Sequence, residues 1–231
     1  MNKQTVRDID VSGKRVFLRV DYNVQFDGDV ILDDHRLKES LPTLRYLIGQ
    51  GAKVIACSHR GRPGGKFVDE LRNAPVAKHL SKLLGQEVLA ASDCVGPEVE
   101  AQVAALQPGQ VLLLENVRFY AQEEANDPQF ARQLANLADV FVSDAFGTAH
   151  RAHASVVGVG YYLPAVSGLL MERELNYLGR VATDGEQPMA LVLGGAKVAD
   201  KIMILKHLVD RVSVLCVGGG IANTFLKAQG L

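Results

Sequence analysis

The sequence predicts a doubly wound α/β fold, in which a parallel sheet is covered by helices on both faces. Short apolar runs, often β-branched, alternate along the chain with longer stretches whose apolar residues have helical spacing. Most of these runs are apolar at every position, which favours strands buried on both faces over strands with one wet face. The expected strands are 15–20, 53–58, 87–90, 111–114, 139–142, 189–193 and 212–217.

Capping residues mark several of the intervening helices. Residues 36–50 follow the candidate caps Asp33 and Asp34 and are followed by Gly51. Asp127 precedes a proline that opens the expected helix 128–138. Helical spacing, with a proline at the first turn in two cases, predicts further helices at 75–84, 97–106, 171–181, 197–209 and 221–228. Strands and helices that alternate over short links indicate α/β architecture.

Composition excludes several classes of protein. The 25 Lys and Arg residues and 26 Asp and Glu residues leave a formal net charge of -1, which argues against non-specific nucleic-acid binding and polybasic membrane contact. No apolar run approaches the roughly 18–20 residues of a membrane span, and the first residues lack the apolar segment of a signal peptide. Cys57, Cys94 and Cys216 are odd in number and far apart, so neither a disulfide framework nor a zinc site is indicated. We expect a cytoplasmic protein, with Cys57 and Cys216 as buried thiols.

Polar residues follow four of the expected strands within the first 151 residues, and three of these four segments contain arginine. The carboxyl ends of parallel strands share one edge of a sheet, where ligands bind. Converging guanidinium groups repel one another unless an anion lies between them, and they match phosphate and carboxylate oxygens. In the alternative interpretation, each arginine is solvated or pairs with a neighbour such as Glu115 or Asp144. The candidate residues are Asp21, Asn23, Arg36, His59, Arg62, Arg118 and Arg151.

Two glycine turns follow the last two strands and lead directly into helices. Glycine lets backbone N–H groups approach a phosphate, and a helix N-terminus favours negative charge. Neither turn fits the P-loop or the dinucleotide fingerprint, and packing alone can produce such turns. Two together, with two lysines one helical turn apart, favour a nucleotide phosphate site. The residues are Gly195, Ala196, Lys197, Lys201, Gly218 and Gly219.

A turn-rich stretch at 183–188 separates the two candidate sites. One anion pocket on each side of a connector is typical of a two-substrate transfer enzyme that closes around its reactants and expels water. Only two strand–helix units follow this connector, too few for an independent domain. We therefore expect the sequence to be the first part of a longer protein.

Seven segments, in order and spread over nearly the whole chain, resemble phosphoglycerate kinase. They are 19–24 (RVDYNV), 33–37 (DDHRL), 58–63 (SHRGRP), 113–119 (LLENVRF), 144–155 (DAFGTAHRAHAS), 193–201 (LGGAKVADK) and 218–226 (GGGIANTFL). Tyr22 departs from the family's usual Phe, and we expect its aromatic ring beside the rim of the site. The resemblance implies a Rossmann-like domain for 3-phosphoglycerate at 1–168, an interdomain helix and connector at 169–188, and the start of a nucleotide domain at 189–231.

The resemblance also implies an activity, namely phosphoryl transfer between 1,3-bisphosphoglycerate and MgADP in glycolysis, by a hinge-bending monomer. The six strand-end residues and Arg36, which opens the first helix at the same rim, would hold 3-phosphoglycerate, and the residues of the glycine turns with Lys201 would hold ADP or ATP. Arg36, Lys197 and Lys201 would be catalytic, with His59 a substrate ligand and no general base, since the reacting group is a carboxylate. Mg²⁺ would arrive with the nucleotide, with its protein ligand beyond residue 231, and this chain alone would be inactive. A non-catalytic binding module for a phosphorylated acid and a generic α/β fold are the alternatives.

Overall fold

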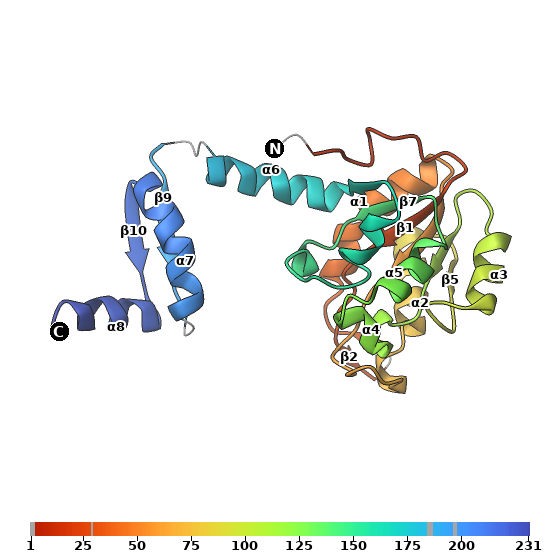
Figure 1. The fold of residues 1–231 in the computed structure, drawn as a ribbon, viewed down its shortest axis with the longest axis horizontal. Helices are drawn as coiled ribbons and strands as arrows, with labels where there is room; N and C mark the ends of the chain where they lie inside the picture. The colour runs from red at the N-terminus through yellow and green to blue at the C-terminus, as the bar shows by residue number, and fades with distance from the viewer. Residues whose placement is uncertain (1–2, 29, 184–186, 196–197) are drawn as a thin grey trace. The chain divides into compact units, whose positions relative to one another are not determined.

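The computed structural model describes residues 3–28, 30–183, 187–195 and 198–231. By its internal contacts the chain divides into two compact units, residues 2–174 and 175–231, and each is described by itself (Figure 1). The division falls inside α6 (Leu169–Thr183), so both units share the expected connector. The domain limits 1–168, 169–188 and 189–231 therefore stay a prediction.

A six-stranded parallel sheet forms the centre of the first unit, in the order β5-β6-β4-β1-β7-β8. Its strands are β1 (Arg15–Arg19), β4 (Lys53–Cys57), β5 (Val88–Ala90), β6 (Val111–Leu113), β7 (Val140–Ser143) and β8 (Ala165–Ser167). The chain first builds the sheet on one side of β1 and then crosses to the other side with β7 and β8. The strand order therefore reverses between β1 and β7, as it does in Rossmann-like folds.

Two apolar cores lie on opposite faces of this sheet, which confirms the doubly wound prediction. Alternate strand residues point to opposite faces, so in β1 Val16 and Leu18 join one core and Phe17 joins the other. The first core is covered by α1 (His35–Gly49) and α2 (Ala74–Leu84), and the second by α3 (Pro97–Ala105) and α5 (Pro128–Ala135). Asp127 caps α5 as predicted, because its Oδ1 accepts a hydrogen bond of 2.8 Å from Phe130 N.

Some elements were not predicted. β2 (Phe26–Asp27) and β3 (Val30–Ile31) form a short antiparallel pair, and α4 (Ala121–Glu124) is a single turn. β8 has three residues directly after Pro164, too few to show a period. Its outer edge pairs with the N-terminal segment, where Ser167 O accepts from Val6 N at 2.8 Å. The 3₁₀ helices are Asp69–Leu71, Val117–Phe119, Phe146–Thr148, Gly158–Tyr161 and Val209–Arg211.

The second unit contains two parallel strands, β9 (Ala190–Leu193) and β10 (Val214–Val217), with α7 (Val198–Leu208) and α8 (Gly219–Ala228). Cys216 is exposed, so the prediction that it is buried is wrong. It pairs in register with Val192, which is 79% exposed, so both lie on a sheet face that no described residue covers. Cys57 is buried as predicted.

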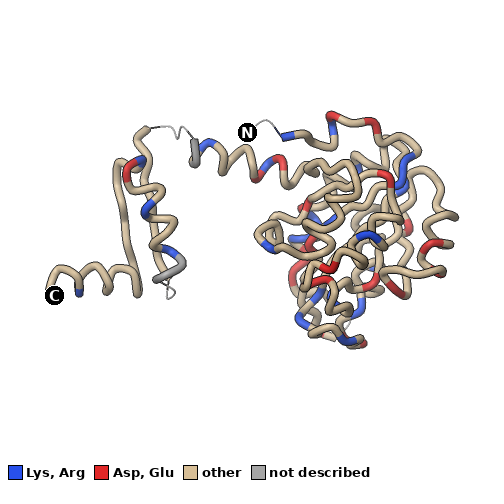
Figure 2. The backbone as a smooth tube through the Cα atoms, in the orientation of Figure 1, with Lys and Arg blue, Asp and Glu red and all other residues tan. Residues whose placement is uncertain are grey.

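Charged residues of both signs are interleaved along the backbone (Figure 2). Among the residues described, no helix has the length and apolar character that crossing a membrane requires.

Candidate functional site

The carboxyl ends of four adjacent strands place the predicted polar segments at one edge of the first sheet. β6, β4, β1 and β7 stand side by side, and Arg19 is in register with both Cys57 and Ser143. Residues 20–24, 58–63, 114–118 and 144–151 follow these strands. This edge contains the reversal of strand order between β1 and β7, where open α/β sheets bind ligands.

His59 lies buried at this edge, with 4% of its surface exposed. Burial, together with the positive charges of nearby arginines, lowers the pKa of His59 to about 2, so the imidazole is neutral near pH 7. The arginines that act on it are Arg19, Arg118, Arg36 and Arg151, called here the arginine cluster. The charges of three of the four predicted arginines therefore act on one histidine, and Arg19 also contacts it directly.

Asp21 holds one member of this cluster in place. Its Oδ2 accepts a hydrogen bond from Arg36 Nη1, and its Oδ1 accepts from Asn23 N at 3.1 Å. A Cβ at Gly147 would lie 2.8 Å from Asp21 Oδ2, so the segment after β7 can approach this carboxylate only because position 147 is glycine. Asp21 thus fixes the guanidinium of Arg36 at the rim of the sheet.

Asn23 and Arg118 hold the loop after β4 from two sides. Asn23 Oδ1 accepts from Gly61 N at 2.8 Å, while Arg118 Nη1 donates to Gly61 O at 2.9 Å. Arg118 is largely buried, and its Nε lies 3.3 Å from Glu124 Oε1. Gly61 has a φ of +63°, a conformation that favours glycine. The loop that carries His59 and Arg62 is thereby tied to the segments after β1 and β6.

Arg62 and Arg151 form no ion pair with any carboxylate in the described ranges of the chain. Arg62 lines a hollow of about 860 Å³ together with Asn23 and Arg60. Arg36 lines a hollow of about 340 Å³. The two adjoin, because Asn23, Val24, Gln25 and Leu32 line both. Two of the predicted arginines therefore keep their donors free for an anion.

Among the described residues, neither Glu115 nor Asp144 forms an ion pair with these arginines, whereas Arg36 pairs with Asp21 and Arg118 with Glu124. Glu115 Oε2 instead accepts from Arg72 Nη1 at 3.1 Å, outside the candidate site. Asp144 Oδ1 accepts from the backbone N–H groups of Leu170 and Met171, at 3.0 and 3.2 Å, at the start of α6. These two carboxylates organise the backbone around the site, because unpaired N–H groups at buried helix starts are costly.

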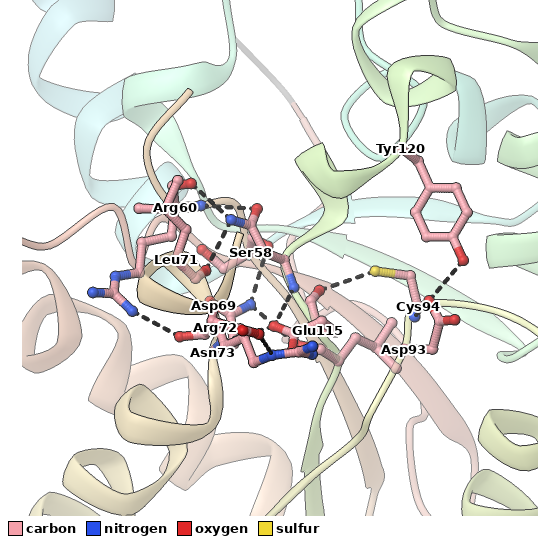
Figure 3. A network of polar contacts seen from close by, with 12 residues as sticks. Ser58, Arg60, Asp69, Leu71, Arg72, Asn73, Asp93, Cys94, Glu115 and Tyr120 are labelled. Carbon is pink, nitrogen blue, oxygen red and sulfur yellow. Dashed lines mark hydrogen bonds and ion pairs between the residues drawn. The ribbon is translucent and has the colours of Figure 1, made fainter. Parts of the chain in front are cut away.

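A polar network centred on Glu115 joins the loops after β4 and β6 to residues 69–73 (Figure 3). Glu115 Oε1 accepts from the backbone N–H groups of Asn73 and Asn116, at 2.7 and 2.8 Å. Its carbonyl oxygen accepts from Cys94 Sγ at 3.0 Å, and Tyr120 donates to Asp93 Oδ1 at 2.7 Å close by. Burial raises the pKa of Cys94 well above its usual value, so this thiol is protonated and structural.

Asn116, fully buried, joins three segments of this network. Its Oδ1 accepts from the backbone N–H groups of Arg60 and Arg118, at 3.1 and 3.2 Å. Its Nδ2 donates to the carbonyl oxygens of Arg60 and Leu71, at 2.7 and 3.0 Å. All of its side-chain hydrogen-bonding capacity is used, which fixes the spacing between the Arg62 loop and Arg118.

Arg19 is the main residue that sequence reasoning missed. It ends β1 with 1% of its surface exposed, and we read it as part of an apolar strand. A charged residue directly after the apolar run Val16–Leu18 was the available signal, because Lys and Arg are almost never fully buried unless paired. Tyr22 also differs from expectation. It is fully buried, and its hydroxyl lies 2.8 Å from Ser40 Oγ instead of beside the rim.

Asp144 makes the stability of the protein depend on pH. Burial raises its pKa to about 6, against hydrogen bonds from Thr43, Met171 and Leu170. The folded state therefore retains a proton between about pH 4 and 6 that the unfolded chain loses, so this group lowers the free energy of unfolding as pH rises through that window. Between about pH 4 and 6, we expect the free energy of unfolding to fall by about 2–3 kcal/mol less in Asp144→Asn than in the unmodified chain. Urea unfolding of both proteins from pH 4 to 7 measures it, and parallel curves would contradict it.

The glycine turns of the second unit lie side by side, because β9 and β10 pair in register. A Cβ at Gly219 would lie 3.8 Å from Gly195 N, and one at Gly194 would lie 3.9 Å from Gly218 O. Lys201 Cε is 3.9 Å from the position of a Cβ on Gly195. Gly195, Gly218, Gly219 and Lys201 are thus close together. Ala196 and Lys197 lie outside the described residues.

Comparison with known proteins identifies the family of this chain. A family model for phosphoglycerate kinase matches residues 6–231. The chain belongs to the phosphoglycerate kinase family. It is 55% identical over 230 residues to the phosphoglycerate kinase of Moorella thermoacetica and 58% identical to that of Pelotomaculum thermopropionicum, and covers 58% of the length of each.

Solved structures in this family have the same fold. The chain superposes on the phosphoglycerate kinase of Coxiella burnetii with a TM-score of 0.87 at 42% identity, and on that of Pyrococcus horikoshii OT3 with 0.86 at 36%. Each match covers 99% of this chain, and 57% and 58% of those chains respectively. The phosphoglycerate kinase family thus accounts for both units of the chain, which spans little more than half the length of these relatives.

Proposed function

We propose that this chain provides the phosphoglycerate-binding part, and the start of the nucleotide-binding part, of a glycolytic kinase. The complete enzyme would transfer a phosphoryl group between 1,3-bisphosphoglycerate and MgADP, yielding 3-phosphoglycerate and MgATP. The observation that carries this proposal is the arginine cluster around the buried, neutral His59, at the reversal of strand order. Membership of the phosphoglycerate kinase family supports it independently.

The polar residues of the first unit suit an acid that carries both a carboxylate and a phosphate. The unpaired guanidinium groups of Arg62 and Arg151 match such oxygens two at a time. Asp21 orients Arg36, and Asn23 can reach a substrate hydroxyl from the wall shared by the two hollows. His59 would act as a neutral hydrogen-bond donor. The buried network of Glu115 and Asn116 would fix the positions of these side chains relative to one another.

The second unit suits nucleotide phosphates. Gly195 and Gly219 are exposed at adjoining turns, where backbone N–H groups can meet a phosphate, and Lys201 adds a cation. This set fits phosphate oxygens and not a metal ion. Ala196 and Lys197, which lie outside the described residues, are assigned to this site from the sequence pattern and the family resemblance. Mg²⁺ would come with the nucleotide and neutralise charge on its phosphates. That its protein ligand lies beyond residue 231 stays a prediction.

Transfer itself would need positioning and charge neutralisation, and no proton transfer. The carboxylate that accepts or releases the phosphoryl group is weakly basic, so it needs no general base near pH 7. His59, with a pKa of about 2, is poorly matched to proton transfer at that pH. Arg36 and Lys197 would neutralise the phosphoryl group in flight, while Lys201 would hold the nucleotide phosphates.

Calorimetry of this chain with 3-phosphoglycerate tests the proposal. We expect one binding site with a Kd between about 10 μM and 1 mM, and much weaker binding of glycerate, which lacks the phosphate. The absence of binding by a folded chain, checked by circular dichroism, would contradict the proposed function. Joining the chain to the C-terminal part of the Moorella thermoacetica enzyme then separates a kinase from a non-catalytic module, because only a kinase produces ATP.

Replacement of Arg62 by alanine tests the arginine site directly. We expect 3-phosphoglycerate to bind about 10-fold more weakly or worse, since a charge-assisted contact is lost, with little change in unfolding free energy because Arg62 is exposed. Arg132→Ala is the matched control. Arg132 is also exposed, but lies on α5, away from the strand ends. Equal affinities for the two variants would show that Arg62 does not bind the ligand.

The cytoplasmic location and monomeric state inferred from the sequence stay predictions. Gel filtration with light scattering would test the second of them.

A further inference from the structure

Glu123 is a buried carboxylate that the proposed mechanism does not use. It lies in α4 with none of its surface exposed. Its Oε1 accepts from the Ser155 hydroxyl at 2.6 Å, and its Oε2 accepts from Ser155 N at 2.8 Å. His153 Nδ1 lies 3.6 Å from Oε1. Both carboxylate oxygens are thus bound to the segment after the 144–151 loop.

Ser155 connects this carboxylate to Arg19. Because the hydroxyl donates its single hydrogen to Glu123, its lone pairs are free to accept, and Arg19 Nε donates to it at 2.8 Å. Arg19 is also almost completely buried, and a buried guanidinium remains charged and needs a counter-charge. Glu123 supplies that counter-charge through the Ser155 hydroxyl, which lies between the two charged groups.

The ionised state of Glu123 follows from the same neighbours. Burial alone would raise the pKa of this carboxyl group. Interactions with His153, with the Arg19 charge and with Ser155 outweigh burial and hold the pKa below its ordinary value. Glu123 is therefore an anion near pH 7, and each of its two carboxylate oxygens accepts a hydrogen bond from Ser155.

Arg19 in turn determines which nitrogen of His59 carries the proton. Its Nη1 donates to Val20 O, and its Nη2 lies 3.3 Å from His59 Nδ1. A guanidinium has only donors, so Nδ1 must be the acceptor. A neutral imidazole that accepts at Nδ1 has its proton on Nε2.

We propose that Glu123 is a positioning residue that, through Ser155 and Arg19, holds the His59 imidazole as the neutral tautomer protonated on Nε2. His59 then presents a fixed N–H donor to an anionic ligand, although it stands among cations. The role of that donor rests on the proposed function, whereas the tautomer is a property of the chain without any ligand. The charged groups that face His59 are Arg19, Arg36, Arg118 and Arg151.

The path from Glu123 through Ser155 and Arg19 to His59 is called here the relay. Nitrogen NMR of the imidazole ring tests it without any ligand. In the ¹⁵N-labelled chain, two-bond ¹H–¹⁵N correlations distinguish the tautomers, and His59→Gln identifies the signals of His59. We expect the Nε2–H tautomer to exceed the other by about 10 to 1 or more from pH 5 to 8, a ratio that corresponds to about 1.4 kcal/mol. A protonated ring at pH 6, or an Nδ1–H tautomer, would overturn the proposal.

Two variants break the relay at different points. Ser155→Ala removes the acceptor of Arg19 Nε but keeps the charge of Glu123. Glu123→Gln removes the charge and places an amide N–H₂ against either the hydroxyl or the N–H of Ser155. In each we expect the tautomer ratio to fall to about 3 to 1 or less, because Arg19 no longer stays on Nδ1. Glu100→Gln, an exposed carboxylate on α3, is the control and should leave the ratio unchanged.

A purely structural role for Glu123 would lower stability without moving the tautomer ratio. Thermal unfolding of each variant is therefore recorded, and Ser155→Ala decides the matter if Glu123→Gln does not fold. Unchanged tautomers in a folded Ser155→Ala chain would overturn the proposal.

Binding of 3-phosphoglycerate forms a separate arm of the experiment. We expect about 10-fold weaker binding by Ser155→Ala, the effect of one charge-assisted hydrogen bond. A wild-type chain with the predicted tautomer but no binding would refute the proposed function and leave the relay intact. Normal binding with normal tautomers in both variants would refute the relay alone.

Discussion

Phosphoryl transfer is expected to fall at least about 10³-fold when Arg36 is replaced by alanine, with the fold unchanged. The guanidinium of Arg36 is held at the rim by Asp21, and its side chain remains 49% exposed, beside a hollow at the strand ends. A fixed cation beside the reacting carboxylate would neutralise charge that develops in the transition state. Since its ion pair is partly solvated, loss of Arg36 should cost little stability.

The measurement is the steady-state rate of the chimaera with the Moorella thermoacetica C-terminal part, coupled to ATP production. Arg45→Ala is a matched control, because Arg45 lies on the same helix and donates to Leu83 O, away from the site. We expect Arg36→Ala to lower kcat by more than it raises KM, the pattern for an interaction made mainly in the transition state. A kcat within tenfold of the unmodified chimaera would exclude the proposed catalytic role.

The main sheet was predictable because its strands are apolar on both faces. A run such as 53–57 cannot lie with one wet face, so it predicts helices on both sides of the sheet, and the two cores bear this out. β8 was not predictable in this way. Its three residues follow a proline, and their strand conformation depends on pairing with β7 and with the N-terminal segment. Such pairing is a tertiary property with no local period.

The exposed charged residues of the candidate site were predictable from the sequence, and the buried ones were less so. Arg62 follows a strand and Arg36 opens a helix, and both stand out in the sequence as exposed charges. Arg19 is a charge at the end of a strand, a signal that sequence reasoning missed, and Glu123 lies in a four-residue helix that is too short to show a period. Their connection through Ser155 spans 136 residues of sequence on one side and 32 on the other. Only the fold shows that these three buried polar side chains satisfy one another.

Glycine at position 168 is expected to be indispensable for stability, with Gly168→Ala lowering the free energy of unfolding by about 3 kcal/mol. A Cβ at this position would lie 2.3 Å from Asp144 Oδ1 and 2.4 Å from its Cγ. The backbone cannot move aside easily, because Gly168 N donates to Ser143 O and Gly168 O accepts from Glu172 N, each at 2.9 Å. Asp144 would therefore have to leave the N-terminus of α6 and lose its two hydrogen bonds there.

Gly168 directly precedes α6, whereas Gly179 lies within it. Urea unfolding of Gly168→Ala and Gly179→Ala compares the two positions. Apart from the backbone of α6 itself, no atom of the described residues lies within 4 Å of a Cβ at Gly179, so alanine there should be neutral or stabilising by up to about 1 kcal/mol. A double-mutant cycle with Asp144→Ala then identifies the cause. If the clash with Asp144 is responsible, Gly168→Ala should cost much less when residue 144 is alanine. The same cost in both backgrounds would place the strain in the backbone and contradict this account.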